Sequence, residues 1–212
     1  VFNLLNSDAF LNTLIEKYWF LTKDILADGI KYPLEGYLYP ETYLFNSNNT
    51  MEDVIYASLD AMDKYLTENK ELIEALNWTP HEFLTFASVV ERESLFDEDR
   101  PKIAGVFKNR LEINMRLQSD ITVNYAWDRT GVDVSYAHLE IDSPYNTYKY
   151  GGLPIGPIST VSAVTMDSCI HYEDNDYLYF FAKQDGTVIY SKTLAEHNKA
   201  VSENKWYYPN NY

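Results

Sequence analysis

The residues best suited to chemistry in this sequence are two glutamates, Glu91 and Glu93, near the end of one predicted helix. Thr79 is suited to the N-cap of that helix, Pro80 to its first position and Glu82 to the matching third position, an arrangement known as a capping box. The segment from residue 83 to 90 is almost entirely apolar. Both acids therefore follow directly on a stretch that we expect to be buried.

Glu91 falls inside the apolar arc of this helix, beside Leu84 and Ala87, whereas Arg92 points the opposite way. A carboxyl group among apolar neighbours has its charged form disfavoured, so its pKa rises from about 4.3 towards neutral pH. We therefore expect a raised pKa at Glu91 and treat it as a candidate general acid. The alternative is a helix-end glutamate that reaches water or pairs with Arg92 or a more distant arginine.

Glu93 touches the apolar arc on its other flank, about 200° around the helix axis from Glu91. We therefore do not expect the two acids to share one pocket.

Composition limits the classes of function. The 212 residues suffice for one substantial core, or for one domain with a small appendage. With 32 acidic against 17 basic residues, the net charge of −15 argues against nucleic acid or anionic lipid as the main partner. The 19 tyrosines offer flat apolar faces with hydroxyl groups, which suit sugar rings as well as the edges of a core.

The sequence lacks the residues and motifs that several kinds of chemistry need. Cys169 is the single cysteine, and the four histidines show no metal-binding spacing, so we expect no disulfide, metal or cofactor. The sequence has no nucleophile elbow, phosphate loop or dinucleotide fingerprint. It also has no apolar run long enough to span a bilayer. Two possibilities remain: carboxylate acid–base catalysis, or a protein without catalytic activity. Because the chain begins at Val1, we expect it to be a piece of a longer protein.

Periodicity predicts an α+β fold, a mainly helical body with a small antiparallel sheet that includes a C-terminal hairpin. Asp185-Gly186 marks the hairpin turn between residues 177–183 and 187–191, and residues 115–118 show a short strand-like alternation. The predicted helices, besides the one from Pro80, cover residues 7–27 with a break near 20–22, 50–65, 72–76, a stretch after 97, 160–169 and 193–205.

Two segments rich in proline, glycine and tyrosine, residues 32–43 and 143–158, are predicted to be irregular. A rigid, aromatic loop as long as the second one is more often a binding wall than a plain connector. Glu35 and Glu41 are the acids of the first segment. Each of them either stabilises a turn or a helix cap, or lies beside a substrate groove.

Seven segments together resemble the catalytic domain of the MltG (YceG-like) endolytic murein transglycosylases. They occur in this order: Leu34-Glu-Gly-Tyr-Leu-Tyr-Pro-Glu-Thr-Tyr43, Ala87-Ser-Val-Val-Glu-Arg-Glu93, Val106-Phe-Lys-Asn-Arg-Leu111, Met115-Arg-Leu-Gln-Ser-Asp120, Ser143-Pro-Tyr-Asn-Thr-Tyr148, Gly152-Leu-Pro-Ile-Gly-Pro-Ile158 and Glu196-His-Asn198. The resemblance covers residues 34–212, which we expect to form the catalytic domain, and periodicity predicts a helical lead-in over residues 1–33.

This resemblance implies cleavage of the β-1,4 bond between N-acetylmuramic acid and N-acetylglucosamine in peptidoglycan, with formation of 1,6-anhydro ends. The catalytic glutamate of the family motif falls on Glu91. Val89 and Arg92 are mild departures from that motif, and Ile121 and Ile155 stand where the family often has proline. None of these departures removes a functional side chain.

The candidates for sugar contacts, or for support of Glu91, are Gln118, Asp120, Tyr145, Asn146 and Tyr148, with Glu35 as a further candidate. A purely structural role is the alternative for each. Two rival functions stay open. One is a hydrolysing muramidase in which Glu35, Glu41 or Asp120 holds a water or acts as nucleophile, and the other is a peptidoglycan-binding module without catalysis.

The resemblance also implies partners and a location. The intact protein is expected to carry an N-terminal membrane anchor and a small LysM-like domain, both absent from these residues. It would act on the extracytoplasmic face of the membrane, on peptidoglycan glycan strands, near the penicillin-binding proteins. There it would terminate nascent strands.

Overall fold

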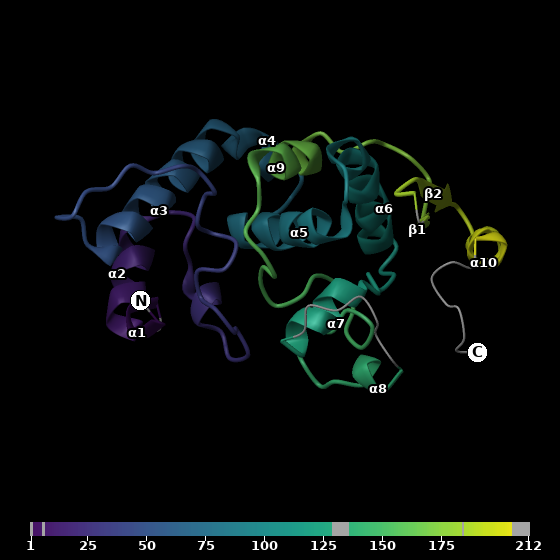
Figure 1. Ribbon diagram of the computed structural model, residues 1–212, viewed down its shortest axis with the longest axis horizontal. Helices are drawn as coiled ribbons and strands as arrows, with labels where there is room; N and C mark the ends of the chain where they lie inside the picture. The colour runs from purple at the N-terminus through teal and green to yellow at the C-terminus, as the bar shows by residue number, and fades with distance from the viewer. Residues whose placement is uncertain (1, 6, 129–135, 184, 205–212) are drawn as a thin grey trace.

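The computed structural model describes residues 2–5, 7–128, 136–183 and 185–204. The predicted α+β fold is confirmed, because the body is mainly helical and a two-stranded antiparallel hairpin lies at its edge, near the C-terminal end (Figure 1). The elements are α1 Phe2–Leu5, α2 Asp8–Lys17, η1 Lys23–Leu26, α3 Met51–Glu68, α4 Lys70–Ala75, α5 Pro80–Glu93, η2 Asp97–Asp99, α6 Arg100–Glu112, α7 Asp120–Ala126, α8 Tyr136–Leu139, α9 Ala163–Ile170, β1 Tyr179–Ala182, β2 Val188–Ser191 and α10 Leu194–Glu203.

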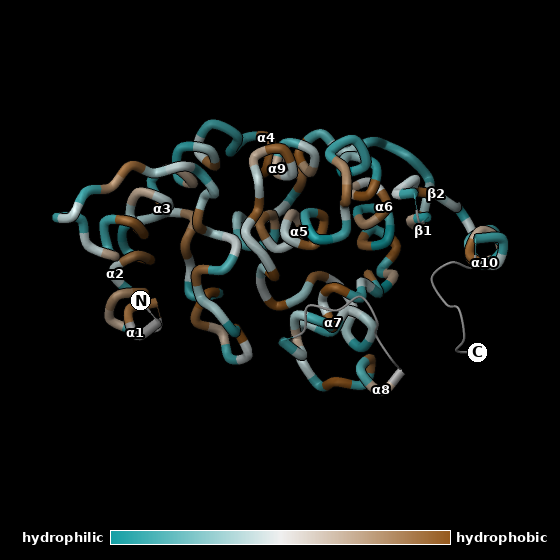
Figure 2. The backbone as a smooth tube through the Cα atoms, viewed as in Figure 1, coloured by the Kyte–Doolittle hydropathy of each residue, from teal (hydrophilic) through white to brown (hydrophobic). Residues whose placement is uncertain are grey.

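Helix α5 lies at the centre of the molecule. Its start is confirmed as predicted, with Pro80 at the first position and a capping box formed by Thr79 and Glu82. Every residue from Phe83 to Val90 is buried, because α6, α7 and α9 all pack against this helix. Hydrophobic stretches mark α5, α6 and α9 in Figure 2. The two ends of α5 leave this apolar surrounding, and the last turn carries the two glutamates.

The N-terminal helices belong to the same core. Leu14 from α2 and Met62 from α3 are completely buried, in one cluster with the residues of α5. Helix α2 ends at Lys17, slightly before the predicted break, because Tyr18 adopts an extended backbone and its hydroxyl donates to Asp60 at 2.5 Å. The proposed division at residue 33 stays a prediction.

The two irregular segments lie against α5, and both lack helix and strand as predicted. His81 from α5 joins them, because its Nδ1 lies 2.5 Å from the hydroxyl of Tyr37 and its Nε2 donates to the carbonyl of Ile155 at 2.8 Å. Further along the helix, the Ser88 hydroxyl accepts a hydrogen bond from the backbone N–H of Ile158 at 3.0 Å. Both loops are therefore fixed to the central helix.

The strand predicted over residues 115–118 is wrong. Within the described structure these residues form no strand and pair with none, and Gln118 has a φ of +47. The alternation has another cause: Leu117 is buried in the core while Gln118 is exposed. The carbonyl of Leu117 accepts from Arg110, and the N–H of Gln118 donates to the carbonyl of Thr147 at 3.2 Å.

The C-terminal hairpin is confirmed in the predicted place, with Tyr179 opposite Ser191 and Ala182 opposite Val188. Residue 184 of the predicted turn lies outside the described residues. Helix α10 packs on both strands, and the ring of His197 stacks on Tyr179 with 5.4 Å between their centroids. The short helices α1 and α8 have no counterpart in the sequence prediction. A four-residue helix is too short to give a periodic signal.

We predict that Gly36→Ala lowers the free energy of unfolding by about 1–3 kcal/mol. Gly36 has φ +79, and an added Cβ would lie 2.4 Å from Cβ of Pro157, so the change strains the backbone and separates the two loops. Gly151→Ala is the matched control, because nothing lies within 4 Å of its added Cβ. Urea denaturation of both variants measures the difference, and equal stabilities would contradict the prediction.

Candidate active site

Glu93, the last residue of α5, is the acid around which a polar cluster forms. Its Oε1 accepts a hydrogen bond from the Ser119 hydroxyl at 2.5 Å. The Glu93 side chain is surrounded by protein atoms, yet the residue keeps part of its surface exposed, while Ser119 is buried. A carboxyl group in this place is crowded and still accessible from solvent.

The pKa of Glu93 is raised to about 7. Burial is the main cause, because a charged carboxylate loses hydration there. The hydrogen bond from Ser119 and the positive charge of Arg110 oppose the shift, and the negative charge of Asp120 adds to it. At neutral pH a large fraction of Glu93 therefore carries a proton that it can donate, as general acid catalysis requires.

Ser119 reaches Glu93 because its hydroxyl is not used as a helix cap. Ser119 occupies the N-cap position of α7, but its side chain makes no capping hydrogen bond. Its backbone N–H instead donates to the Thr147 hydroxyl at 3.0 Å, and that hydroxyl lies 2.9 Å from the hydroxyl of Thr122. These buried contacts fix Ser119 and leave its hydroxyl directed at the acid.

Gln118 has an uncommon backbone conformation beside this acid. Its φ of +47 lies in the left-handed region, which residues other than glycine rarely adopt. The neighbouring contacts to Thr147 hold it there, and such enforced strain occurs preferentially at functional sites. The Gln118 side chain is exposed and forms no hydrogen bond to another described residue. It is thus available to a ligand.

Asp120 and Tyr148 form the second half of the cluster. The Tyr148 hydroxyl donates a short hydrogen bond to Oδ1 of Asp120. Burial raises the pKa of Asp120, and the hydrogen bond from Tyr148 partly offsets this effect. Because the charge of Asp120 raises the pKa of Glu93, these two carboxyl groups influence each other directly.

Arg110 from α6 is the cation behind the acid. It is only 7% exposed, its Nε donates to the carbonyl of Leu178 at 2.6 Å, and its Nη1 donates to the carbonyl of Leu117. Its guanidinium carbon also lies 5.3 Å from the centroid of the Tyr179 ring. Arg110 therefore connects the hairpin to the loop before α7 and places positive charge near Glu93.

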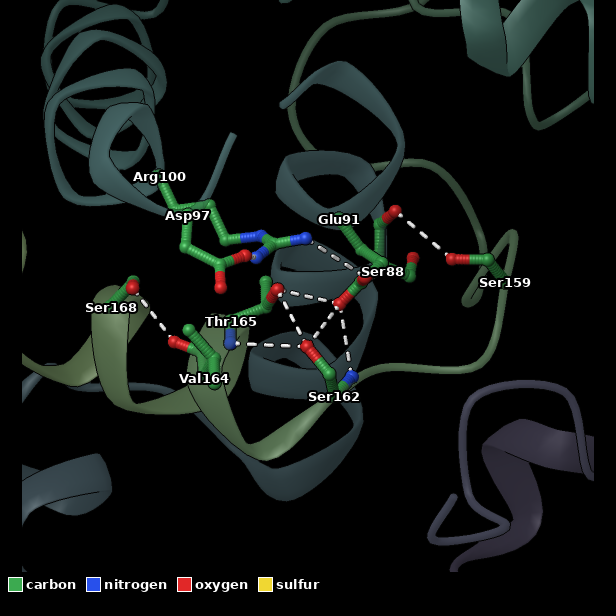
Figure 3. A network of polar contacts seen from close by, with 9 residues as sticks. All are labelled: Ser88, Glu91, Asp97, Arg100, Ser159, Ser162, Val164, Thr165 and Ser168. Carbon is green, nitrogen blue, oxygen red and sulfur yellow. Dashed lines mark hydrogen bonds and ion pairs between the residues drawn. The ribbon is translucent and has the colours of Figure 1, made fainter. Parts of the chain in front are cut away.

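Glu91 lies in a different network, which Figure 3 shows at close range. Its Oε2 accepts from the backbone N–H of Ser162 at 2.9 Å, from the Ser162 hydroxyl at 2.8 Å and from the Thr165 hydroxyl at 2.5 Å. Its Oε1 pairs with Arg100 at 3.3 Å. Oε2 is thus bound at the start of α9 and Oε1 at the start of α6.

The predicted raised pKa of Glu91 is wrong. Burial does raise the pKa, but the hydrogen bonds from Thr165 and Ser162 and the charge of Arg100 outweigh it, so the pKa is lowered. A helical wheel represents the neighbours on one helix only, and the donors come from α9 and α6. The alternative stated for Glu91, a pairing with a more distant arginine, matches the structure.

Two of the candidate sugar contacts have no surface for a ligand. Tyr145 is 1% exposed and Asn146 is completely buried. The Asn146 side chain donates to the carbonyls of Leu139 and Ile141 at 2.8 and 2.9 Å, and the Tyr145 hydroxyl accepts from the N–H of Lys31 at 3.3 Å. Their burial contradicts direct contact with a sugar and fits the structural alternative.

Glu35 and Glu41 do not belong to the cluster around Glu93. Glu35 lines a separate pocket of about 260 Å³, and Glu41 is exposed. The sequence analysis missed Ser119 as the partner of an acid, along with Arg110 and Thr147. Ser119 lies inside the segment from Met115 to Asp120, one of the seven that carry the family resemblance. That segment was the one indication in the sequence that Ser119 belongs to the site.

The described residues hold no group of three or more His, Cys, Asp or Glu side chains that could bind a metal ion. In the same part of the chain, every helix is too short or too polar to cross a membrane. The geometry brings together side chains suited to general acid–base chemistry. A half-buried carboxyl group with a pKa near 7 lies among serine, glutamine and tyrosine side chains on a mainly helical α+β body.

The chain belongs to the YceG-like family, whose sequence pattern matches residues 4–203. It is 44% identical over 198 residues to an endolytic murein transglycosylase of Bacillus subtilis (strain 168), covering 92% of this chain and 55% of the relative. It is 40% identical over 204 residues to an endolytic murein transglycosylase of Streptococcus pneumoniae serotype 2 (strain D39 / NCTC 7466), covering 92% and 37%. The chain thus spans about half, or less, of these relatives.

The fold is also similar to a solved structure, that of a putative YceG-like protein of Listeria monocytogenes. The TM-score is 0.88 and the sequence identity 42%, over 93% of this chain and 66% of that one.

We predict opposite effects of pH on stability from the two glutamates. Because the folded-state pKa of Glu93 lies near 7, above an unfolded value of about 4.5, folded chains bind the extra proton between these values. Stability from this group is therefore highest below pH 4.5 and falls, by up to about 3 kcal/mol, as pH rises to 7. Glu93→Gln removes this fall, and urea denaturation from pH 4.5 to 8 measures it.

Glu91→Gln is expected to remove a dependence of the opposite sign, a loss of stability as pH falls. The lowered pKa of Glu91 stabilises the fold above its unfolded pKa, and this stabilisation is lost as pH falls through the folded value. The amide cannot pair with Arg100, so the variant should be less stable than the parent at pH 7, by about 2 kcal/mol. A Glu91→Gln variant as stable as the parent at pH 7 would contradict the assigned network.

Proposed function

We propose that this chain is the catalytic part of an endolytic peptidoglycan lytic transglycosylase. It would cleave the β-1,4 bond between N-acetylmuramic acid and N-acetylglucosamine inside a glycan strand and leave a 1,6-anhydro end. The names of the relatives from Bacillus subtilis and Streptococcus pneumoniae support this substrate and reaction. The single observation that carries the proposal is the half-buried Glu93, with a pKa of about 7, which accepts a hydrogen bond from Ser119 and lies near Asp120.

We infer that Glu93 is the catalytic acid. Its protonated carboxyl group donates to the glycosidic oxygen as the C1–O bond breaks, while the sugar gains oxocarbenium character. The resulting carboxylate then accepts the proton of the C6 hydroxyl of the same N-acetylmuramic acid, and the C6 oxygen bonds to C1. The proton returns to Glu93, so one carboxyl group completes the cycle without water.

The surrounding residues support both charge states of Glu93. Burial and Asp120 favour the neutral acid before bond cleavage, whereas Ser119 and Arg110 stabilise the carboxylate after it. Gln118 is the described side chain next to Ser119 that is free to contact the sugar, and Tyr148 holds Asp120 in place. The family motif places the acid at Glu91 instead, so the two assignments make opposite predictions.

We predict that Glu93→Gln lowers turnover of peptidoglycan strands by about 10²–10⁴-fold at pH 7, the usual contribution of a general acid. The amide fits the same space but has no proton to donate. Glu91→Gln is the matched control from the same helix and should retain most of the turnover per folded molecule. Loss of turnover in Glu91→Gln alone, with an intact fold by circular dichroism, would instead support the motif assignment.

A hydrolysing muramidase is the second candidate, and the electrostatic coupling of Asp120 to Glu93 favours it. A second carboxyl group near the acid could hold a water or act as nucleophile, as in glycosidases that use two carboxylates. Mass analysis of digested strands separates the two functions. A transglycosylase yields products 18 Da lighter than those of hydrolysis, because it adds no water, whereas reducing ends would show a hydrolase.

Location and partners are further parts of the proposal. From the family resemblance, we infer that the intact protein is anchored by a membrane helix that precedes these residues and acts near penicillin-binding proteins. The penicillin-binding proteins would make the strands that this enzyme terminates. Fractionation of cells that express the full-length protein, followed by cross-linking, tests both points.

A further inference from the structure

Lys31 joins the helical lead-in (residues 1–33) to the helix that begins at the proposed site. Its ammonium group donates to the backbone carbonyls of Tyr125 and Ala126 at 2.8 and 3.2 Å, and it pairs with Asp128 at 2.6 Å. Tyr125 and Ala126 are the last two residues of α7. The last carbonyls of a helix have no partner within the helix, and a cation there also interacts favourably with the helix dipole. Lys31 therefore closes the C-terminal end of α7.

The turn that follows α7 adds a second observation. Asp128 has φ +54, in the left-handed region where glycine is the usual residue after a helix. Its N–H donates to the carbonyl of Tyr125 at 3.2 Å, and its carboxylate accepts from the ammonium group of Lys31. The Lys31 side chain is only 23% exposed. One partly buried lysine thus binds three oxygen atoms of a turn whose backbone is strained.

The backbone of Lys31 contacts the other support of the site, the tyrosine-rich loop (residues 143–158). Its N–H donates to the hydroxyl of Tyr145 at 3.3 Å. The Tyr145 ring also packs on that of Tyr125, with 4.8 Å between their centroids. Tyr145 comes two residues before Thr147, whose hydroxyl accepts from the N–H of Ser119. Lys31 is therefore bonded both to α7 and to the loop that holds Ser119.

These two connections meet at the N-terminal end of α7. Ser119 is the N-cap of this helix and donates to Glu93 at 2.5 Å, and Asp120 is its first residue. The helix has seven residues and is about 10 Å long, so it moves as one short body. A displacement at the end that Lys31 binds is then passed on to Ser119 and Asp120. Lys31 lies at the opposite end of α7 from Glu93, so any influence on the acid passes through this helix and the loop.

We propose that Lys31 is a positioning residue, which holds α7 and the tyrosine-rich loop in the arrangement that directs the Ser119 hydroxyl at Glu93. Its effect on turnover rests on the proposed function, whereas the fixing of Ser119 is independent of the bond that the enzyme cleaves. The role also makes the lead-in a working part of the catalytic unit.

Lys31→Met tests this role, because methionine keeps an apolar stem and lacks the charge and the donors. With peptidoglycan strands at pH 7, kcat per folded molecule should fall about ten-fold, since a small misplacement of catalytic groups slows the reaction strongly. KM should stay nearly unchanged, because a residue that acts through α7 does not bind the substrate. Lys31→Arg keeps a cation with several donors and should restore most of kcat.

Lys23→Met is the matched control, because Lys23 is an exposed lysine of the same lead-in, in η1. It should behave as the parent chain does. A kcat at the parent level in Lys31→Met, or an equal loss in Lys23→Met, would overturn the positioning role. So would a rise in KM with kcat unchanged, because Lys31 would then act on substrate binding.

Hydrogen exchange followed by NMR gives a readout that needs no turnover. In Lys31→Met the amides of Gln118 and Ser119, which donate to Thr147, should exchange about ten-fold faster or more, while that of Phe86 in the middle of α5 keeps the rate of the parent. Unchanged exchange at Ser119, or equal acceleration at Phe86, would overturn the proposal. Failure of the proposed function would appear separately, as absence of anhydro products from the parent chain, and exchange at Ser119 would still decide the role of Lys31.

Discussion

The hydrogen bond that Ser119 donates to Glu93 is the contact on which the arrangement of the candidate site depends. It joins the end of the central helix α5 to the start of α7. Ser119 in turn is held by Thr147, which belongs to the tyrosine-rich loop. Three segments far apart in the sequence therefore meet at one carboxyl group. The hydroxyl that would otherwise cap α7 is the group that α7 gives up for this connection.

The two glutamates of α5 show how strongly the local number of donors decides acidity. Both are partly withdrawn from water, and burial is the largest single influence on each pKa. Glu91 receives three hydrogen bonds on one oxygen and an arginine on the other, so its pKa falls. Glu93 receives one hydrogen bond and faces Asp120, so its pKa rises. The first arrangement keeps a charge in place, and the second allows a proton to come and go.

The sequence was sufficient for the elements that local rules specify. The capping box at Thr79, the hairpin turn at Asp185 and Gly186, and the irregular tyrosine-rich loops are all found in the predicted places. The contacts between elements could not be predicted from the sequence. The direction of the pKa shift at Glu91 depends on donors about 70 residues away in the sequence, and the burial of Tyr145 depends on how its loop packs. Helical periodicity carries no information on either.

The position of Arg110 links the distant C-terminal hairpin to the electrostatics of Glu93. A catalytic acid that must also act as a base needs its neutral and charged forms to be close in free energy. Burial and Asp120 alone would hold the proton too tightly, and a paired arginine, as at Glu91, would release it too early. Arg110 lies between these cases, because its hydrogen bonds go to the carbonyls of Leu117 and Leu178 while its charge still acts on the acid. The carbonyl of Leu178, next to the first strand of the hairpin, helps to hold the guanidinium in that position, together with the carbonyl of Leu117.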